Sequence, residues 1–159
     1  MIDEIMKKIM IVLAAVAAMV LISACDKYED RRPSKDIINE FDRLYPDAWD
    51  IVWDYEGTYW EVYFETGPRP NGVEHMAVFD LSANWVSTKT ELPLNSVPQK
   101  IKDYLAESPY GDLQYEDYFV DYYETPTGNF YRFDVHLNGD NAEIDVTEDG
   151  KVSVAGYGY

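Results

Sequence analysis

One order of hydrophobic patterns occurs twice along the chain and constrains the fold more than any other feature of the sequence. Each copy begins with apolar residues at helical spacing and continues with apolar–polar alternation after a glycine. The helical spacing is carried by Ile37, Ile38, Phe41, Leu44 and Tyr45 in the first copy, and by Val97, Ile101, Tyr104 and Leu105 in the second. The alternation is clearest at residues 59–65, after Gly57, and at 130–136, after Gly128. We therefore expect a tandem α-β-β-β-β unit, with repeats at 34–94 and 95–159.

Capping and breaking residues set the expected helix ends. Ser34 is a suitable N-cap for the first helix, and Pro46 ends it. Asn95 or Ser96 is expected to cap the second helix, with Pro98 in its first turn and Pro109 at its end. The remaining strands are expected at 48–55, 76–81, 85–90, 115–124, 142–146 and 152–157.

Each half has too few apolar positions to close a core alone, so the halves are expected to share one. The economical arrangement is an α+β fold in which one extended antiparallel sheet carries both helices on one face and leaves the other open. Alternation places Trp60, Val62, Phe64, Tyr131, Phe133 and Val135 under the helices. It places Tyr59, Glu61, Tyr63, Phe130, Arg132, Asp134 and His136 on the open face.

The N-terminal segment resembles an export signal. Lys7 and Lys8 precede an apolar run at 9–22, which is short for a membrane span and of the right length for a signal peptide. Ser23, Ala24 and Cys25 then match the lipobox, in which the cysteine is lipidated. We expect a lipoprotein signal peptide at 1–24 and a charged tether at 25–33, so that the protein is anchored in the cell envelope by lipid on Cys25. The alternative is a signal anchor that happens to contain one cysteine.

The formal net charge of −17 is informative mainly by exclusion. A surface this acidic repels phosphate backbones and anionic headgroups, so no nucleic-acid partner is expected, and membrane contact is expected only through Cys25. The charge suits a cationic partner, although acidity that serves only solubility is the simpler interpretation.

Several aromatic and Gly/Pro spacings, together with the lipobox, resemble a known family. They are Tyr45-Pro46, Trp53, the Gly57 to Phe64 pattern, Phe79-Asp80 before Trp85, and Leu92-Pro93 before the second helix. They resemble the PepSY-like, beta-lactamase-inhibitor-like lipoproteins of Bacteroidetes, over residues 34–159. The resemblance implies a tandem α+β fold with an extended sheet whose concave face can grip a protein, and it supplies no catalytic residues. Asn84 stands where that pattern has a turn glycine, and asparagine tolerates the left-handed conformation.

The residues that usually carry catalysis are sparse. His75 and His136 are the only histidines, neither has metal-ligand spacing, and both are expected on the surface. No nucleophile motif or free cysteine is expected after lipidation, and no cofactor is expected. Asp140, Glu143, Asp145 and Asp149 could bind calcium weakly, but their spacing fails the EF-hand pattern, and solvated turn acids are the simpler interpretation.

Two surfaces are candidates for binding another exported or envelope protein. The first is the open face, with Tyr59, Tyr63, Phe130 and Arg132, because tyrosine and arginine are frequent at interface hot spots. Tyrosine is also common on any wetted strand. The second is the loop at 66–74 with Arg69, which also fits a plain connector. A non-enzymatic protein-binding or inhibitory role is favoured, the alternatives being a ligand- or glycan-binding accessory protein and an uncharacterised hydrolase.

Overall fold

The computed structural model describes residues 32–111, 118–137 and 140–155. The expected signal peptide, Cys25 and most of the tether lie outside these residues, as do parts of the strands expected at 115–124 and 152–157. Residues 33–159 form one compact unit, to which all of the following refers. None of the helices in the described ranges has both the length and the apolar character needed to cross a bilayer.

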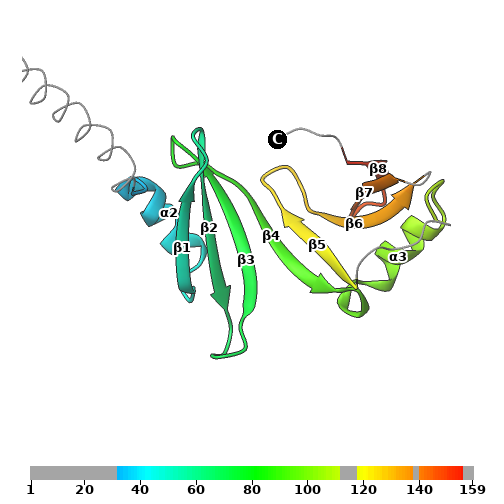
Figure 1. Ribbon diagram of the computed structural model, residues 1–159, viewed down its shortest axis with the longest axis horizontal. Coiled ribbons are helices and arrows are strands. Elements are labelled where there is room, and N and C mark those ends of the chain that lie inside the picture. The colour runs from blue at the N-terminus through cyan, green and yellow to red at the C-terminus, as the bar shows by residue number, and fades with distance from the viewer. Residues whose placement is uncertain (1–31, 112–117, 138–139, 156–159) are drawn as a thin grey trace, which may run out of the picture. The chain divides into compact units, whose positions relative to one another are not determined.

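The predicted order of elements is present twice (Figure 1). The first copy consists of helix α2 (Lys35–Leu44) and strands β1 (Trp49–Tyr55), β2 (Tyr59–Thr66), β3 (Val73–Asp80) and β4 (Trp85–Pro93). A short 3₁₀ turn, η1 (Leu94–Ser96), follows. The second copy consists of helix α3 (Gln99–Ala106) and strands β5 (Phe119–Glu124), β6 (Phe130–Leu137), β7 (Asp140–Thr147) and β8 (Val152–Val154).

Helix α2 begins and ends as its sequence predicts. The Ser34 hydroxyl accepts a hydrogen bond from the Ile37 amide at 3.3 Å, which satisfies one of the free amides of the first turn. The helix ends at Leu44 because Pro46 disfavours the helical conformation in the residue before it. Ile37 and Phe41 are buried on one side of the helix.

Helix α3 begins later than predicted, so the prediction of an Asn95 or Ser96 cap is wrong. Both residues lie in η1, and the N-cap is Pro98, which makes no side-chain capping bond. The physical reason is the proline itself, because its ring holds Val97 in an extended conformation (ψ 131°) and prevents a helix from starting before it. The helix then ends at Ala106, three residues before Pro109.

All eight strands form one antiparallel sheet in the order β1 to β8, in which each strand pairs with its neighbours in the chain. Gly57 and Gly128 have φ angles of 85° and 137°, so both turns use a backbone conformation that glycine adopts without strain. In the β3–β4 turn the left-handed residue is Ala83 (φ 65°), not Asn84. Asn84 instead donates its backbone and side-chain N–H groups to the Asp80 carboxylate, which fixes the turn.

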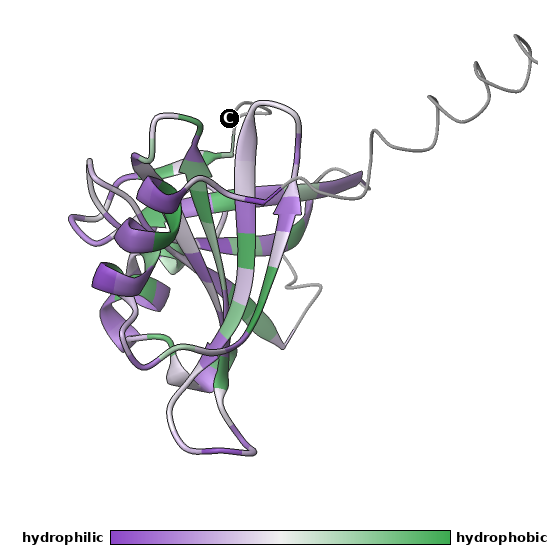
Figure 2. Cartoon of the chain, turned by 90° about the vertical axis from the view of Figure 1, so that its left-hand side faces the viewer, coloured by the Kyte–Doolittle hydropathy of each residue, from purple (hydrophilic) through white to green (hydrophobic). Residues whose placement is uncertain are grey.

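The strand register places both helices on one face. Trp60 lies opposite Phe79, and the same face continues from Ala77 through Thr88 to Glu124. It continues further from Tyr122 through Tyr131 to Val146. Because directly opposite residues point to the same side of a sheet, the residues under α2 and those under α3 share a face. Figure 2 shows hydrophilic residues along the outer sides of the helices and alternating hydropathy along the strands.

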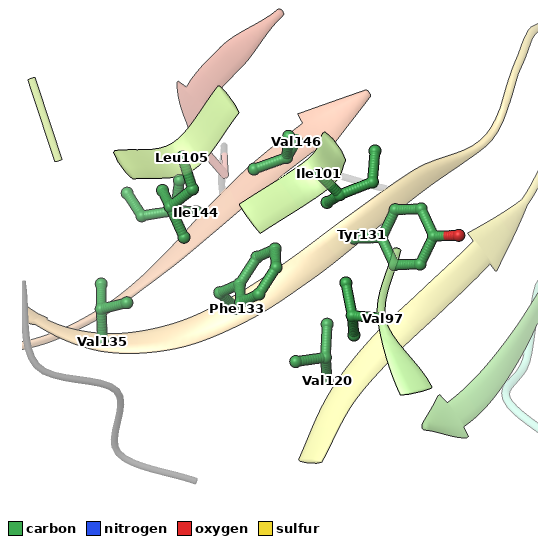
Figure 3. Close-up of a cluster of buried hydrophobic side chains, with 9 residues drawn as sticks. All are labelled: Val97, Ile101, Leu105, Val120, Tyr131, Phe133, Val135, Ile144 and Val146. Carbon is green, nitrogen blue, oxygen red and sulfur yellow. The ribbon is translucent and has the colours of Figure 1, made fainter. Parts of the chain in front are cut away.

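Two separate hydrophobic clusters lie on this face, rather than the shared core that the sequence suggested. The cluster under α2 contains Ile37, Phe41, Trp60, Val62, Phe64, Ala77 and Phe79. The cluster with α3 contains Val97, Ile101, Leu105, Val120, Tyr131, Phe133, Val135, Ile144 and Val146 (Figure 3). Trp60, Phe64, Tyr131 and Phe133 are therefore buried as predicted.

The clusters are separate because the helix-side residues of β4 between them are polar. Thr88 and Thr90 are buried there. The Thr88 hydroxyl is hydrogen-bonded to the Tyr45 hydroxyl and accepts the indole N–H of Trp85 at 2.8 Å. A hydrogen-bonded polar strip thus separates the two clusters, and Leu92 at the end of β4 packs against the second one.

Candidate functional site

The open face of the sheet, opposite the helices, carries one row of side chains that crosses seven strands. Val52 lies opposite Tyr63, Tyr63 opposite Met76, and Met76 opposite Lys89. Lys89 lies opposite Tyr123, Tyr123 opposite Phe130, and Phe130 opposite Thr147. We call Val52, Tyr63, Met76, Lys89, Tyr123, Phe130 and Thr147 the central row. Opposed side chains on one face are neighbours, so the row forms a continuous surface.

The β1–β3 part of the central row is exposed. Val52 and Tyr63 are 57% and 45% exposed, whereas Met76 is partly covered. The Tyr63 hydroxyl donates a hydrogen bond to the Glu61 carboxylate at 2.7 Å. That bond, partial burial and the charges of Glu61, Asp54 and Glu56 together raise the pKa of Tyr63 to about 12. Tyr63 therefore presents a neutral ring and hydroxyl in a negative environment.

The β5–β6 part of the central row is covered by Arg132. The Tyr123 and Phe130 rings stack with centroids 4.8 Å apart, and the guanidinium of Arg132 lies 4.9 Å from the Tyr123 centroid. Arg132 Nε donates to Asp145 Oδ1 at 2.7 Å, and its Nη2 donates to Oδ2 of the same carboxylate at 3.0 Å. Tyr123 is only 6% exposed as a result. A bidentate ion pair of this kind holds the guanidinium in place over the rings.

The five residues predicted for binding are not all brought together. Tyr63 and Phe130 both lie in the central row, and Arg132 lies beside it. Tyr59 is at the start of β2, opposite Asp80 and away from the row. Arg69 is on the β2–β3 loop, where its guanidinium lies 4.8 Å from the centroid of the Trp49 ring.

Sequence reasoning missed five members of the row, namely Val52, Met76, Lys89, Tyr123 and Thr147. Alternation assigns each to one side of its own strand, but only the register between strands shows that they are neighbours. Ile51, which alternates with Val52, is also exposed (43%), because the pairing of β1 with β2 shifts between Trp49 and Val52. Asp50, with a φ of 54°, lies at this irregularity.

The two histidines lie on different strands and on opposite faces of the sheet, His75 on β3 and His136 on β6. His136 is exposed, as predicted, whereas the prediction for His75 is wrong. His75 is half-buried on the helix side, stacked on Phe64, and its two ring nitrogens each lie 2.8 Å from a threonine hydroxyl, Thr66 on one side and Thr90 on the other. Burial lowers the pKa of His75. The alternation of His75 with Ala77 and Phe79 is the sequence signal that indicates its true side.

No cluster of three or more histidine, cysteine or carboxylate side chains in the described part of the chain could hold a metal ion. Asp145, one of the residues considered for calcium, is paired with Arg132, and Glu143 Oε2 lies 3.4 Å from Arg132 Nη1. The Asp149 carboxylate accepts a hydrogen bond from the Thr147 hydroxyl at 2.5 Å. These contacts fit acidic residues that stabilise a sheet and a turn.

Fold and surface together define an α+β protein in which two α-β-β-β-β units build one sheet with an open, partly aromatic face. Residues 58–153 match the family model described as "Putative beta-lactamase-inhibitor-like, PepSY-like". The chain belongs to this family. No functionally curated protein matches the sequence.

Solved structures with the same fold come from several Bacteroides species. A BLIP-like protein from Bacteroides fragilis is 27% identical over 80% of this chain and 88% of its own, with a TM-score of 0.68. A DUF2874 family protein from Bacteroides ovatus is 20% identical over 79% and 89% of the two chains, with a TM-score of 0.64. A protein from Bacteroides eggerthii, described as a "putative periplasmic" protein, is 21% identical over 77% of this chain and 86% of its own, with a TM-score of 0.61.

Proposed function

We propose that this chain is a non-enzymatic, lipid-anchored envelope protein that binds another exported protein through the open face of its sheet. The observation that carries the proposal is the exposed part of the central row. Val52 and Tyr63 are side by side on the face opposite α2 and α3, and they contribute little to either hydrophobic cluster. Adjacent exposed apolar and aromatic side chains with a polar rim are typical of protein-binding surfaces.

The family supports the same proposal. The matching family is described as beta-lactamase-inhibitor-like, and the Bacteroides fragilis protein as BLIP-like. A protein that inhibits an enzyme must bind to it, so these descriptions favour a binding role. Lipid on Cys25 would hold the module at a membrane surface, where its partner would be another envelope protein. The loop at 67–72 is less suited to recognition, because Arg69 is stacked on Trp49 and the Trp49 indole donates to the Gly67 carbonyl at 3.2 Å.

Site-specific photo-crosslinking in intact cells tests the proposal. A photoreactive amino acid is placed at Val52 or Tyr63 on the open face, and at Asn39 or Asp103 on the exposed sides of the helices as matched controls. We expect one discrete crosslinked protein at both sheet positions and none at the helix positions. The crosslinked protein is then identified by mass spectrometry and its complex is reconstituted from purified components.

Truncation variants add an independent readout. Val52→Ala and Tyr63→Ala are expected to weaken the reconstituted complex by about 2–4 kcal/mol together while leaving the urea midpoint almost unchanged. Crosslinks only at the helix positions would move the binding surface to the opposite face. If only a change of Arg69 abolished binding of the partner, the binding surface would be the loop. If the protein bound a sugar and no crosslinked protein partner were found, the glycan-binding alternative would be favoured instead.

A further inference from the structure

Four pairs of carboxylates oppose each other across the described strands of the open face, and two of these pairs lie on β1–β3. Asp54 lies directly opposite Glu61, and Glu65 lies directly opposite Glu74. Each pair is two residues from the central row along its strands, so one pair flanks each side of Val52, Tyr63 and Met76. Like charges at opposed positions destabilise an antiparallel sheet. The fold thus retains two unfavourable pairs around its exposed apolar surface.

No lysine or arginine within the described residues neutralises these four carboxylates. The ion pairs found there join Arg43 to Glu40, Lys89 to Asp121, and Arg132 to Glu143 and Asp145. From residue 47 to residue 88 the chain has no lysine and a single arginine, Arg69. The same stretch contains eight carboxylates, namely Asp47, Asp50, Asp54, Glu56, Glu61, Glu65, Glu74 and Asp80.

On the second half of the same face, most carboxylates are paired with a lysine or an arginine. Asp121 lies 3.3 Å from the ammonium group of Lys89, and Asp145 is held by Arg132. Asp134 opposes Glu143, but Glu143 also lies within 3.4 Å of Arg132. The aromatic rings of this half are covered by that same arginine. On β4–β5, Glu91 opposes Asp121 near the exposed Phe119, but Asp121 is paired with Lys89. Within the described sheet, opposed carboxylate pairs in which neither member makes an ion pair therefore lie beside exposed apolar side chains only on β1–β3.

We infer that this β1–β3 surface docks a cationic protein segment, whose lysine or arginine side chains flank apolar or aromatic ones. The inference rests on the proposed binding role of the sheet face and specifies the chemistry of the partner. Positive side chains beside Val52 and Tyr63 would meet the Asp54–Glu61 pair on one side and the Glu65–Glu74 pair on the other. They would relieve the repulsion within each pair, whereas an anionic segment would add to it.

Binding of three matched synthetic peptides tests the inference. One is a 12-residue peptide that alternates lysine with tryptophan and leucine, and the other two have glutamine or glutamate at every lysine position. Each is titrated into ¹⁵N-labelled residues 33–159, which contain both hydrophobic clusters and all eight strands. We expect the lysine peptide to shift the amides of Val52, Tyr63 and Met76 and to bind at least tenfold more tightly than the glutamine peptide. Its affinity should fall as salt is added.

Charge-neutral variants separate the local charges from the overall charge. Glu65→Gln with Glu74→Gln removes one opposed pair without changing side-chain shape. Asp42→Asn with Glu107→Gln makes the same change in net charge at exposed residues of the helical elements. The sheet variant is expected to bind the lysine peptide about threefold to tenfold more weakly, as expected for two exposed ion pairs, and to have a higher urea midpoint. The helix variant should do neither.

Three outcomes would overturn the inference, and they differ in what they leave standing. Equal binding of the lysine and glutamine peptides, with shifts on the central row, would reject the cationic partner but keep the sheet face as the binding surface. Equal weakening in the sheet and helix variants would mean that net charge, and not this surface, attracts the peptide. If every peptide changed the amide chemical shifts only of residues outside β1–β3, both the inference and the proposed function would be rejected.

Discussion

Replacement of Phe41 by alanine is expected to destabilise the first hydrophobic cluster severely. Phe41 is 1% exposed and is surrounded by four aromatic rings. The centroid distances from its ring are 5.1 Å to Phe64, 5.3 Å to Trp53, 5.4 Å to Tyr45 and 6.4 Å to Phe79. Three of these pairs are edge-to-face, the geometry that aromatic quadrupoles favour.

The expected cost of the Phe41→Ala change is about 3–5 kcal/mol in the free energy of unfolding, the usual range for a buried phenylalanine. A domain of this size is typically stable by only about 5–15 kcal/mol, so a large fraction of its stability would be lost. Equilibrium unfolding of residues 33–159 in urea, followed by tryptophan fluorescence, measures this directly. Trp53 and Trp60 both belong to or pack against the affected cluster, so their signal reports on the right part of the molecule.

Asn39→Ala is the matched control, because Asn39 is on the exposed side of the same helix. This change should alter stability by less than about 0.5 kcal/mol, or slightly increase it, since alanine is the better helix former. A loss below 1 kcal/mol for Phe41→Ala, or an equal effect of both variants, would show that α2 does not pack on the sheet through Phe41.

Three further predictions concern other parts of the chain. Because burial lowers the pKa of His75, neutral His75 stabilises the fold fully above the unfolded-state pKa of about 6.5, and stability should decline as the pH falls below that value. His75→Gln should remove this decline in urea titrations between about pH 7 and 5.5; an unchanged decline would assign it to another group. Arg132→Gln should lower the free energy of unfolding by about 1–3 kcal/mol and make Tyr123 more accessible to solvent. Quenching of tyrosine fluorescence measures this accessibility, and unchanged quenching would refute the covering role of the guanidinium. Cys25→Ala should move the protein from the membrane to the soluble or precursor fraction, and continued membrane association after carbonate washing would contradict lipid anchoring.

The sequence alone determined the secondary structure and the side to which most strand residues point. Helical spacing before Pro46 and alternation around Trp60 and Phe133 are local properties, because a side chain's direction depends only on its place in its own helix or strand. For this reason the two-copy order, the open antiparallel sheet and the burial of the aromatic residues were predictable. The start of α3 is also a local property, because Pro98 holds Val97 in an extended conformation, although the polar residues Asn95 and Ser96 predict an earlier start.

Only the tertiary structure decided which residues are neighbours across strands. The register that brings Val52, Tyr63 and Met76 into one row depends on turn lengths and on the irregular pairing at Asp50, which no single strand's alternation contains. The environment of His75 was hidden for the same reason, since its two threonine partners come from β2 and β4. The opposed carboxylates around Tyr63 likewise became visible only once the strands were paired, because repulsion between charges depends on distance in space and not along the chain.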